Sequence, residues 1–261
     1  MPSPAEDIFV AHNKEHLGQG LAEAEYLRER LQPRLRDVNA LYFADLLDLT
    51  RTWAAKVSGN LFDYGCGGSP YRALFNQCSR YVRADVTPGP GIDRMLPADG
   101  GTGELPDSYD VVFSSQVLEH VKAPADYVAE CVRILKPGGW LILTTHGMWE
   151  EHGCPYDFQR WTSRGLEELA RSAGFTIVES CKITTGARAA CLLLHQSVVH
   201  LKCPERAWLH YPLSVCRLLH RWLGVPTLNW LGRACFRQGI VPGATDSASL
   251  YLGVAILARK P

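Results

Sequence analysis

A short apolar strand that runs into a glycine-rich turn is the part of this sequence with the clearest chemistry. Residues 61–69 read LFDYGCGGS, so a predicted strand reaches Asp63 and enters a turn that holds Gly65 and Gly67. Glycine lacks the Cβ atom that blocks close approach and tolerates positive φ, so a ligand can lie against this main chain. A short helix expected at residues 71–78 would present free N–H groups to an anionic part of that ligand. The segment predicts a nucleotide-like cofactor site, with a plain glycine-rich turn as the alternative.

Two further positions bear on which cofactor this turn binds. A dinucleotide fingerprint requires a third glycine three positions after the second, and Pro70 occupies that position. A nicotinamide dehydrogenase is therefore disfavoured, while a cofactor without a pyrophosphate stays open. Asp85 ends the next predicted strand, where a carboxylate can accept both hydroxyl hydrogens of a ribose or merely cap a loop.

Apolar runs alternate with amphipathic stretches along the middle of the chain, which is typical of an α/β fold. Strands are expected at 61–64, 81–86, 92–97, 109–114, 139–145 and 176–183, and helices at 124–135 and 162–173. This alternation predicts a doubly wound, mostly parallel sheet covered by helices on both faces. We divide the chain into an N-terminal helical cap (1–58), a core (59–185), an inserted helical lobe (186–245) and a last strand (246–261). The cap is expected to hold two helices separated at Pro33.

The last two segments allow more specific expectations. Residues 246–261 must pair with strands already formed, most simply with an edge strand in an antiparallel sense. Within the lobe, residues 207–223 place aromatic and aliphatic side chains near one helical face beside two arginines, with Pro212 as a point of division. Such a face can lie on a membrane, cover an active site, form a dimer contact or simply pack in a core. These residues are Trp208, Tyr211, Val215, Arg217, Leu218, Leu219, Arg221 and Trp222.

Composition narrows the class of protein. The 261 residues are 46% hydrophobic and have a formal net charge of zero, which indicates a globular chain and disfavours nucleic acid as a partner. Nine cysteines without a Cys-x-x-Cys pair fit a reducing compartment. The first twenty residues do not resemble a signal peptide, and no apolar run reaches the roughly 18–20 residues of a membrane span. We expect a cytoplasmic protein, with peripheral membrane contact through 207–223 as an open alternative.

Four segments in the same order resemble the class I S-adenosylmethionine-dependent methyltransferases. They are DYGCGGS (63–69), YVRADV (81–86), SYDVVFSSQVLEHV (108–121) and RILKPGGWLILTT (133–145). The resemblance is to the broad branch with Leu-Glu-His and Leu-Lys-Pro-Gly-Gly motifs, and it covers about residues 60–185. It implies a Rossmann-like, seven-stranded sheet with six parallel strands and an antiparallel last strand. It also implies S-adenosyl-L-methionine as the cofactor.

The resemblance assigns cofactor contacts to individual residues. Asp63 would support the ammonium group of the cofactor, and its alternative role is to stabilise the turn. Gly65 and Gly67 would admit the methionine portion and the sugar, while Ser69 replaces a third glycine of the family. Asp85 would bind the ribose hydroxyls.

The remaining cofactor contacts are expected at the adenine and at the sulfonium. The adenine acid is either Asp93 or Asp99, and the family spacing before Leu105 favours Asp99. Ser115 and Gln116 follow the fourth predicted strand, at the edge where open α/β sheets bind their ligands. We expect these two residues at the methionine and sulfonium end.

The implied reaction is attack of a substrate nucleophile on the cofactor's methyl group, with a general base needed chiefly for a hydroxyl. His146, at the end of a predicted strand, is the first candidate base because a histidine pKa of about 6.5 allows proton uptake near neutral pH. Tyr156 and Asp157 follow as base or orienting groups, although Asp157 has pairing with Arg160 as an equal alternative. His152 is expected to be a solvated loop residue. The acceptor would be a saccharide, a lipid-linked molecule or a secondary metabolite.

Glu119 and His120 form a second polar pair, in the Leu-Glu-His motif. Adjacent residues on a helix point about 100° apart, so we expect these two to orient the loop and bind backbone instead of facing one atom. The sequence assigns no residues to a metal ion. A cofactor-binding scaffold that has lost catalysis is the alternative to an active enzyme, and calorimetry with the cofactor followed by a methyl-transfer assay separates the two.

Overall fold

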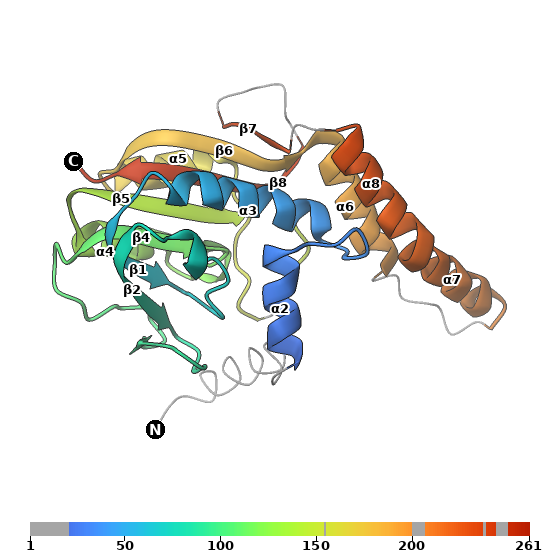
Figure 1. The fold of residues 1–261 in the computed structure, drawn as a ribbon, viewed down its shortest axis with the longest axis horizontal. Coiled ribbons are helices and arrows are strands. Elements are labelled where there is room, and N and C mark those ends of the chain that lie inside the picture. The colour runs from blue at the N-terminus through green and yellow to red at the C-terminus, as the bar shows by residue number, and fades with distance from the viewer. Residues whose placement is uncertain (1–20, 154, 200–206, 237–238, 244–249) are drawn as a thin grey trace.

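A computed structural model describes residues 21–153, 155–199, 207–236, 239–243 and 250–261. At its centre is an eight-stranded sheet in the order β3-β2-β1-β4-β5-β8-β6-β7 (Figure 1). The strands are β1 (Gly59–Tyr64), β2 (Cys78–Asp85), β3 (Arg94–Met95), β4 (Tyr109–Ser115), β5 (Leu135–His146), β6 (Thr176–Thr185), β7 (Ile240–Pro242) and β8 (Tyr251–Arg259). The expected α/β architecture is confirmed, and β7 adds one strand to the seven that the resemblance implies.

The last strand, β8, lies inside the sheet and not at its edge. Strands β3, β2, β1, β4 and β5 are parallel, and β8 pairs antiparallel with β5 on one side and with β6 on the other. The expected antiparallel pairing of β8 is therefore confirmed, but β8 pairs with two strands, β5 and β6, and not with a single edge strand. An interior position pairs the backbone groups on both sides of the strand, while an edge strand leaves one row unpaired.

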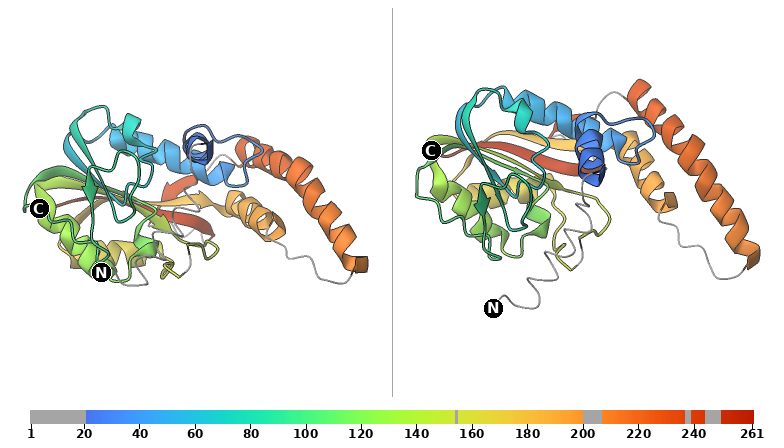
Figure 2. Two further views of the ribbon diagram at one scale, coloured as in Figure 1. Left: turned by 90° about the horizontal axis from the view of Figure 1, so that it is seen from below. Right: turned by 60° about the horizontal axis from the view of Figure 1, so that its bottom comes forward.

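Helices cover both faces of this sheet. They are α2 (Leu21–Leu31), α3 (Ala40–Ala54), α4 (Pro124–Ile134), α5 (Ser163–Ser172), α6 (Gly186–Val199), α7 (Ala207–Leu219) and α8 (Val225–Ala234). Figure 2 shows α3 on the face opposite α4 and α5. Because side chains alternate along a strand, Leu141 and Leu143 of β5 pack in the cluster with α4 and α5, and Ile142 packs in the cluster with α3 and α6.

The helix expected after the glycine-rich turn is not formed. A single 3-10 turn, η1 (Arg72–Leu74), stands there, and β2 already begins at Cys78. Tyr71 and Phe75 are buried in the cluster beneath α3, so this segment is fixed by core packing instead of by a helical hydrogen-bond ladder. The helix N-terminus proposed as an anion partner is therefore wrong for this site.

The C-terminal lobe is helical, as expected, and contributes β7 to the sheet. Its helix α7 passes through Pro212 without a break and continues into η3 (His220–Gly224), a π-helical turn, and then into α8. This long helical arm projects away from the sheet (Figures 1 and 2). The side chain of Trp208 lies outside those that the structure describes, as do residues 244–249. In the part of the chain that is described, none of the helices has the length and apolar character that crossing a bilayer requires.

A buried ion pair joins the lobe to the cap. Arg188 of α6 lies 2.6 Å from Asp45 Oδ1 of α3, and Thr184 donates a hydrogen bond of 2.7 Å to Asp45 Oδ2. Arg188 also donates to the carbonyl oxygen of Gly232 in α8. Burial raises the pKa of Asp45 above its usual range, against the pull of the arginine. The pair therefore depends on both partners, because removing one leaves the other charge buried.

We expect Arg188→Met to lower the free energy of unfolding by about 3–5 kcal/mol, since Asp45 would stay buried without its cation. Urea unfolding followed by circular dichroism measures this change. The matched control is Arg51→Met, which breaks an exposed pair with Asp48 and should cost about 1 kcal/mol or less. Equal losses in the two variants would contradict the role of the buried pair.

Candidate active site

The glycine-rich turn forms a tight cradle at the carboxyl end of β1. Gly65 has φ of +78° and Gly67 has φ of +49°, a region that favours glycine. A Cβ atom on Gly65 would lie 2.5 Å from Val117 Cγ2, and one on Gly67 would lie 3.4 Å from the hydroxyl of Tyr26. Larger residues at these positions would fill the cradle, so the turn keeps the main chain accessible. Tyr26, on α2, covers the turn from the side of the cap.

Two aspartates meet this cradle. Asp85, at the end of β2, accepts hydrogen bonds of 2.8 Å from the backbone N–H groups of Gly67 and Thr87. Asp63 is buried and accepts a hydrogen bond of 2.7 Å from the hydroxyl of Tyr81. Burial raises the pKa of Asp63 to about 7, so a cationic ammonium nearby would stabilise its charged form. The carboxylates and the cradle therefore fit the ribose, ammonium and methionine groups of the implied cofactor.

The two aspartates that are candidates for binding the adenine have different partners in the structure. Asp93 is held in an ion pair with Arg83, whose Nε lies 3.1 Å from Asp93 Oδ2. Asp99 accepts a hydrogen bond only from the backbone N–H of Gly101 among the bonds described, at 3.0 Å. The next residue, Gly100, accepts a hydrogen bond from the hydroxyl of Tyr64 at the end of β1. That bond holds the Asp99 loop beside the cradle, which favours Asp99.

Residues after β4 approach the cap at the same edge of the sheet. Gln116 has φ of +59°, a strained value for a residue with a side chain. Its amide donates to Thr144 Oγ1 at 3.0 Å and accepts from the hydroxyl of Tyr42 at 2.9 Å. Ser115 Oγ lies 2.9 Å from the same Thr144 oxygen. These bonds fix the end of β4 opposite the glycine-rich turn.

His146 ends β5 and is buried. Its ring stacks on Trp149 with centroids 4.4 Å apart, and its Nδ1 lies 3.5 Å from the hydroxyl of Tyr42. Its Nε2 lies 3.3 Å from Glu119 Oε1. Burial, together with the nearby His152 and Arg160, lowers the pKa of His146 well below its usual value, so the ring is neutral at neutral pH. A neutral ring can take up a proton, as a base must.

The other two candidate bases are held in different ways. Asp157 is engaged by Arg160, whose two terminal nitrogens each lie 2.6 Å from one of its carboxylate oxygens. Burial alone would raise the pKa of Asp157, but the hydrogen bonds from Arg160 and from the backbone N–H of His152 outweigh burial, so the pKa is lowered. Asp157 therefore orients the loop 147–162. Tyr156 is half-buried, and its carbonyl oxygen is 2.6 Å from His120 Nδ1.

Two expectations about this region are wrong. The Leu-Glu-His motif forms a 3-10 turn, η2 (Leu118–His120), in place of an α-helix. Ligand atoms of Glu119 and His120 lie within 4.8 Å of each other and of His152, so the adjacent residues do face a common space. His152 lies in a loop with its side chain 36% exposed, and its ring also packs edge-on against those of His146 and His120. The expected backbone contact of His120 is confirmed by its bond to Tyr156.

A pocket is lined in part by Trp149, the residue on which His146 stacks. It has a volume of about 360 Å³ and is lined by residues of the loop 147–162 and by Tyr251 at the start of β8, namely Gly147, Met148, Trp149, Arg160, Trp161, Thr162 and Tyr251. Three of these seven residues are aromatic. Binding sites for small molecules commonly combine apolar walls with a few polar groups, so this pocket can receive an acceptor.

Sequence reasoning missed three aromatic residues of the site. Tyr26 and Tyr42 come from the cap, and their periodicity marks them only as helical core positions. Trp149 belongs to a loop rich in polar residues, where its stacking on His146 has no local signal. All three reach the site through contacts between segments distant in sequence, which a periodicity cannot show.

Comparison with known proteins agrees with this geometry. Residues 62–143 match the model of a methyltransferase domain. A ubiquinone biosynthesis O-methyltransferase of Bordetella pertussis is 30% identical over 120 residues, which cover 36% of this chain and 47% of that protein. A probable S-adenosylmethionine-dependent methyltransferase of Mycolicibacterium smegmatis is 34% identical over 118 residues, or 43% of each chain. The chain thus spans about half the length of these relatives.

Solved structures extend the similarity of fold over nearly the whole chain. An S-adenosylmethionine-dependent methyltransferase of Thermotoga maritima, described as a possible histamine N-methyltransferase, has a TM-score of 0.55 and 14% identity, covering 97% of this chain and all of that one. A phosphoethanolamine N-methyltransferase of Haemonchus contortus has a TM-score of 0.54 and 16% identity, covering 97% and 60%. At such identities the likeness concerns the fold alone.

The motifs, the sheet and the matched domain point to one class of protein. Residues 62–143 carry a methyltransferase domain, and the chain is similar to S-adenosylmethionine-dependent methyltransferases. The cofactor of this family is S-adenosyl-L-methionine. The assignments of single residues to parts of the cofactor remain predictions.

We expect Asp99→Asn to weaken binding of S-adenosylhomocysteine about 10- to 100-fold, because a hydrogen bond to a charged group contributes about 1.5–3 kcal/mol. Isothermal titration calorimetry measures the change. Asp93→Asn is the matched control and should bind as the wild type does, since Asp93 is already paired with Arg83. The reverse order of effects would move the adenine contact to Asp93.

Proposed function

We propose that this protein transfers the methyl group of S-adenosylmethionine to a hydroxyl oxygen of a small-molecule acceptor, and that His146 takes up the acceptor's proton. The observation that carries the proposal is the neutral, buried His146 at the carboxyl edge of the sheet, where the glycine-rich turn and Asp85 also lie. Cofactor and base thereby converge on one edge, which is where α/β sheets bind their ligands.

The bound cofactor supplies a methyl group on a positively charged sulfur, which is already activated for transfer. Transfer would join the methyl carbon to the acceptor oxygen and leave the electron pair of the carbon–sulfur bond on sulfur, while His146 would take up the hydroxyl proton. The chain aligns the reactants and excludes water, which accounts for much of the rate in such displacements. Tyr42 and Trp149 hold the His146 ring in place.

The choice of a hydroxyl acceptor is supported by the base and by the relatives. Nitrogen and sulfur nucleophiles often react without a base, whereas a hydroxyl gains from one. Several of the similar proteins are named as O-methyltransferases of ubiquinone biosynthesis. The alternative, a scaffold that binds the cofactor without catalysis, predicts binding of S-adenosylhomocysteine and no methyl transfer to any acceptor.

We further propose that the long helical arm contacts a membrane surface and that the acceptor is lipid-linked. Large apolar side chains on this arm are exposed, among them Leu218 at 56%, Trp222 at 62% and Leu223 at 63%. Arg217 and Arg221 stand among them and can attract anionic headgroups. A helix with an apolar face and basic residues is suited to the interface of a bilayer. The exposed face therefore supports a lipid-linked acceptor over a free saccharide.

We expect His146→Asn to lower the rate of methyl transfer about 10²–10⁴-fold, the usual contribution of a general base. Affinity for S-adenosylhomocysteine should not change, which serves as the control for folding. Because the pKa of His146 lies well below 6.5, the neutral form persists as pH falls, so the wild-type rate should hold from about pH 8 to about pH 6.5 and decline only below. An undiminished rate in the variant would remove His146 as the base.

We expect the double variant Leu218→Glu/Trp222→Glu to lose association with vesicles that contain anionic lipid, because two charges would enter the apolar interface. Co-sedimentation with vesicles measures the bound fraction. Leu105→Glu is the matched control, since Leu105 is 76% exposed but lies in the core domain. Equal binding of both variants and the wild type would contradict membrane contact through the arm.

A further inference from the structure

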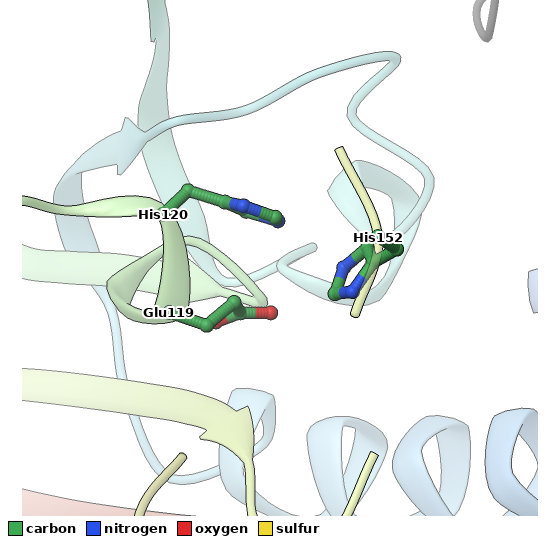
Figure 3. Close-up of side chains that lie close together, drawn as sticks. All are labelled: Glu119, His120 and His152. Carbon is green, nitrogen blue, oxygen red and sulfur yellow. The ribbon is translucent and has the colours of Figure 1, made fainter. Parts of the chain in front are cut away.

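Three potential metal ligands converge beside His146. Glu119 and His120 come from η2, and His152 comes from the loop 147–162. One ligand atom from each lies within 4.8 Å of the others, and Figure 3 shows the three side chains extending into a shared space. The loop is tied to η2 by a hydrogen bond of 2.9 Å from the backbone N–H of Phe158 to the carbonyl oxygen of Glu119. The cluster is thus held by backbone contacts on both of its sides.

Glu119 brings a buried carboxylate with one unused oxygen. The side chain is fully buried, and its Oε2 accepts a hydrogen bond of 2.8 Å from Thr145. Its Oε1 accepts no hydrogen bond from the described residues, although His146 Nε2 lies 3.3 Å away. A buried polar atom without a partner is costly, and a bound cation would remove that cost.

Each of the two histidines has its Nδ1 atom beside a backbone carbonyl oxygen. His120 Nδ1 lies 2.6 Å from the carbonyl oxygen of Tyr156, and His152 Nδ1 lies 3.3 Å from that of Glu150. A carbonyl oxygen only accepts, so Nδ1 carries the proton in each neutral ring and Nε2 keeps its lone pair. Histidines that bind metals commonly donate their other N–H to a carbonyl or carboxylate in this way.

Arg160 is the arginine of the loop 147–162, and Asp157 offsets part of its charge because Arg160 donates to both carboxylate oxygens of Asp157.

We propose that Glu119 Oε1 and the Nε2 atoms of His120 and His152 bind a divalent transition-metal ion such as Zn²⁺. Two histidines and one carboxylate form a donor set that suits zinc and leaves a coordination position open. Zinc bonds of about 2.0–2.1 Å place tetrahedral ligand atoms roughly 3.4 Å apart. Since the present separations are at most 4.8 Å, the ligand atoms would move together by no more than about 1.4 Å. His152, on a loop, can supply that movement.

His146 lies beside this cluster, with its ring centroid 5.1 Å from that of His152. If the proposed O-methylation holds, on which this role rests, an acceptor hydroxyl bound at the open coordination position would have a lowered pKa and would lose its proton to His146 more readily. The metal would then help to select hydroxylated acceptors.

The test uses the full chain, treated with a chelator, dialysed and titrated with Zn²⁺ by calorimetry, with bound metal measured by elemental analysis. We expect one Zn²⁺ per chain and no displacement by a millimolar excess of Mg²⁺, because nitrogen ligands favour zinc. His152→Ala should weaken binding at least about tenfold, by analogy with the 10–100-fold loss on removing outer-shell partners of ligands. The matched control is His210→Ala, an exposed histidine on α7, which should bind Zn²⁺ as the wild type does.

Two further readouts keep the result unambiguous. Co²⁺ in place of Zn²⁺ should show no thiolate charge-transfer band, whereas binding through cysteines would show one and overturn the proposal. Failure of the wild type to bind Zn²⁺, or equal binding by His152→Ala, would overturn it as well. Titration of the same samples with S-adenosylhomocysteine tests the proposed function separately. A protein that binds S-adenosylhomocysteine but not Zn²⁺ would contradict only the metal site. A protein that binds Zn²⁺ but not S-adenosylhomocysteine would contradict only the proposed methyl transfer.

Discussion

The pairing of β1 with both β2 and β4 is the constraint on which the rest of the structure depends. The parallel strands on either side of β1 bring the ends of β1, β2 and β4 to one edge of the sheet. Chain connections diverge at this point, which leaves room for a ligand beyond the carboxyl ends. The glycine-rich turn borders that room at Gly65 and Gly67, which have no side chains. Asp85, at the end of β2, accepts a hydrogen bond from the backbone N–H of Gly67 on the same border.

Burial of polar groups is the second feature that shapes the site. Asp63, Glu119 and His146 are all buried, and burial raises the pKa of the two acids and lowers that of the histidine. Each shift disfavours the charged form in the protein alone. A cofactor with an ammonium group, an acceptor with a hydroxyl and a divalent cation would each stabilise one of these groups. We therefore expect ligand binding to stabilise charges that the protein alone disfavours at this site.

Helix α3 of the cap contacts both the candidate active site and the C-terminal lobe. Tyr42 lies on the same helix as Asp45, so one helix carries both a contact to His146 and the ion pair that anchors α6. Burying one face of α3 against the sheet thus fixes the site and the base of the arm at once. The arm beyond that anchor keeps a large apolar surface exposed, which is uncommon in a protein without a binding partner for it.

The sequence by itself determined the class of fold and the cofactor of the family. Strands with apolar runs and a motif such as DYGCGGS carry a local signal, because hydrophobic periodicity and glycine turns depend on neighbouring residues. The tertiary structure decided what depends on contacts between distant segments. In the structure β8 lies between β5 and β6, and a 3-10 turn stands where a short helix was predicted. Asp93 forms an ion pair with Arg83.

The cluster of Glu119, His120 and His152 also depends on contacts between distant segments. As residues of a helix, Glu119 and His120 would diverge, and His152 lies more than thirty positions later in the chain. In the folded protein a 3-10 turn and a loop tied to it bring the three side chains into one space. Neither periodicity nor spacing contains that information, since it arises only when the carboxyl ends of β4 and β5 are set side by side.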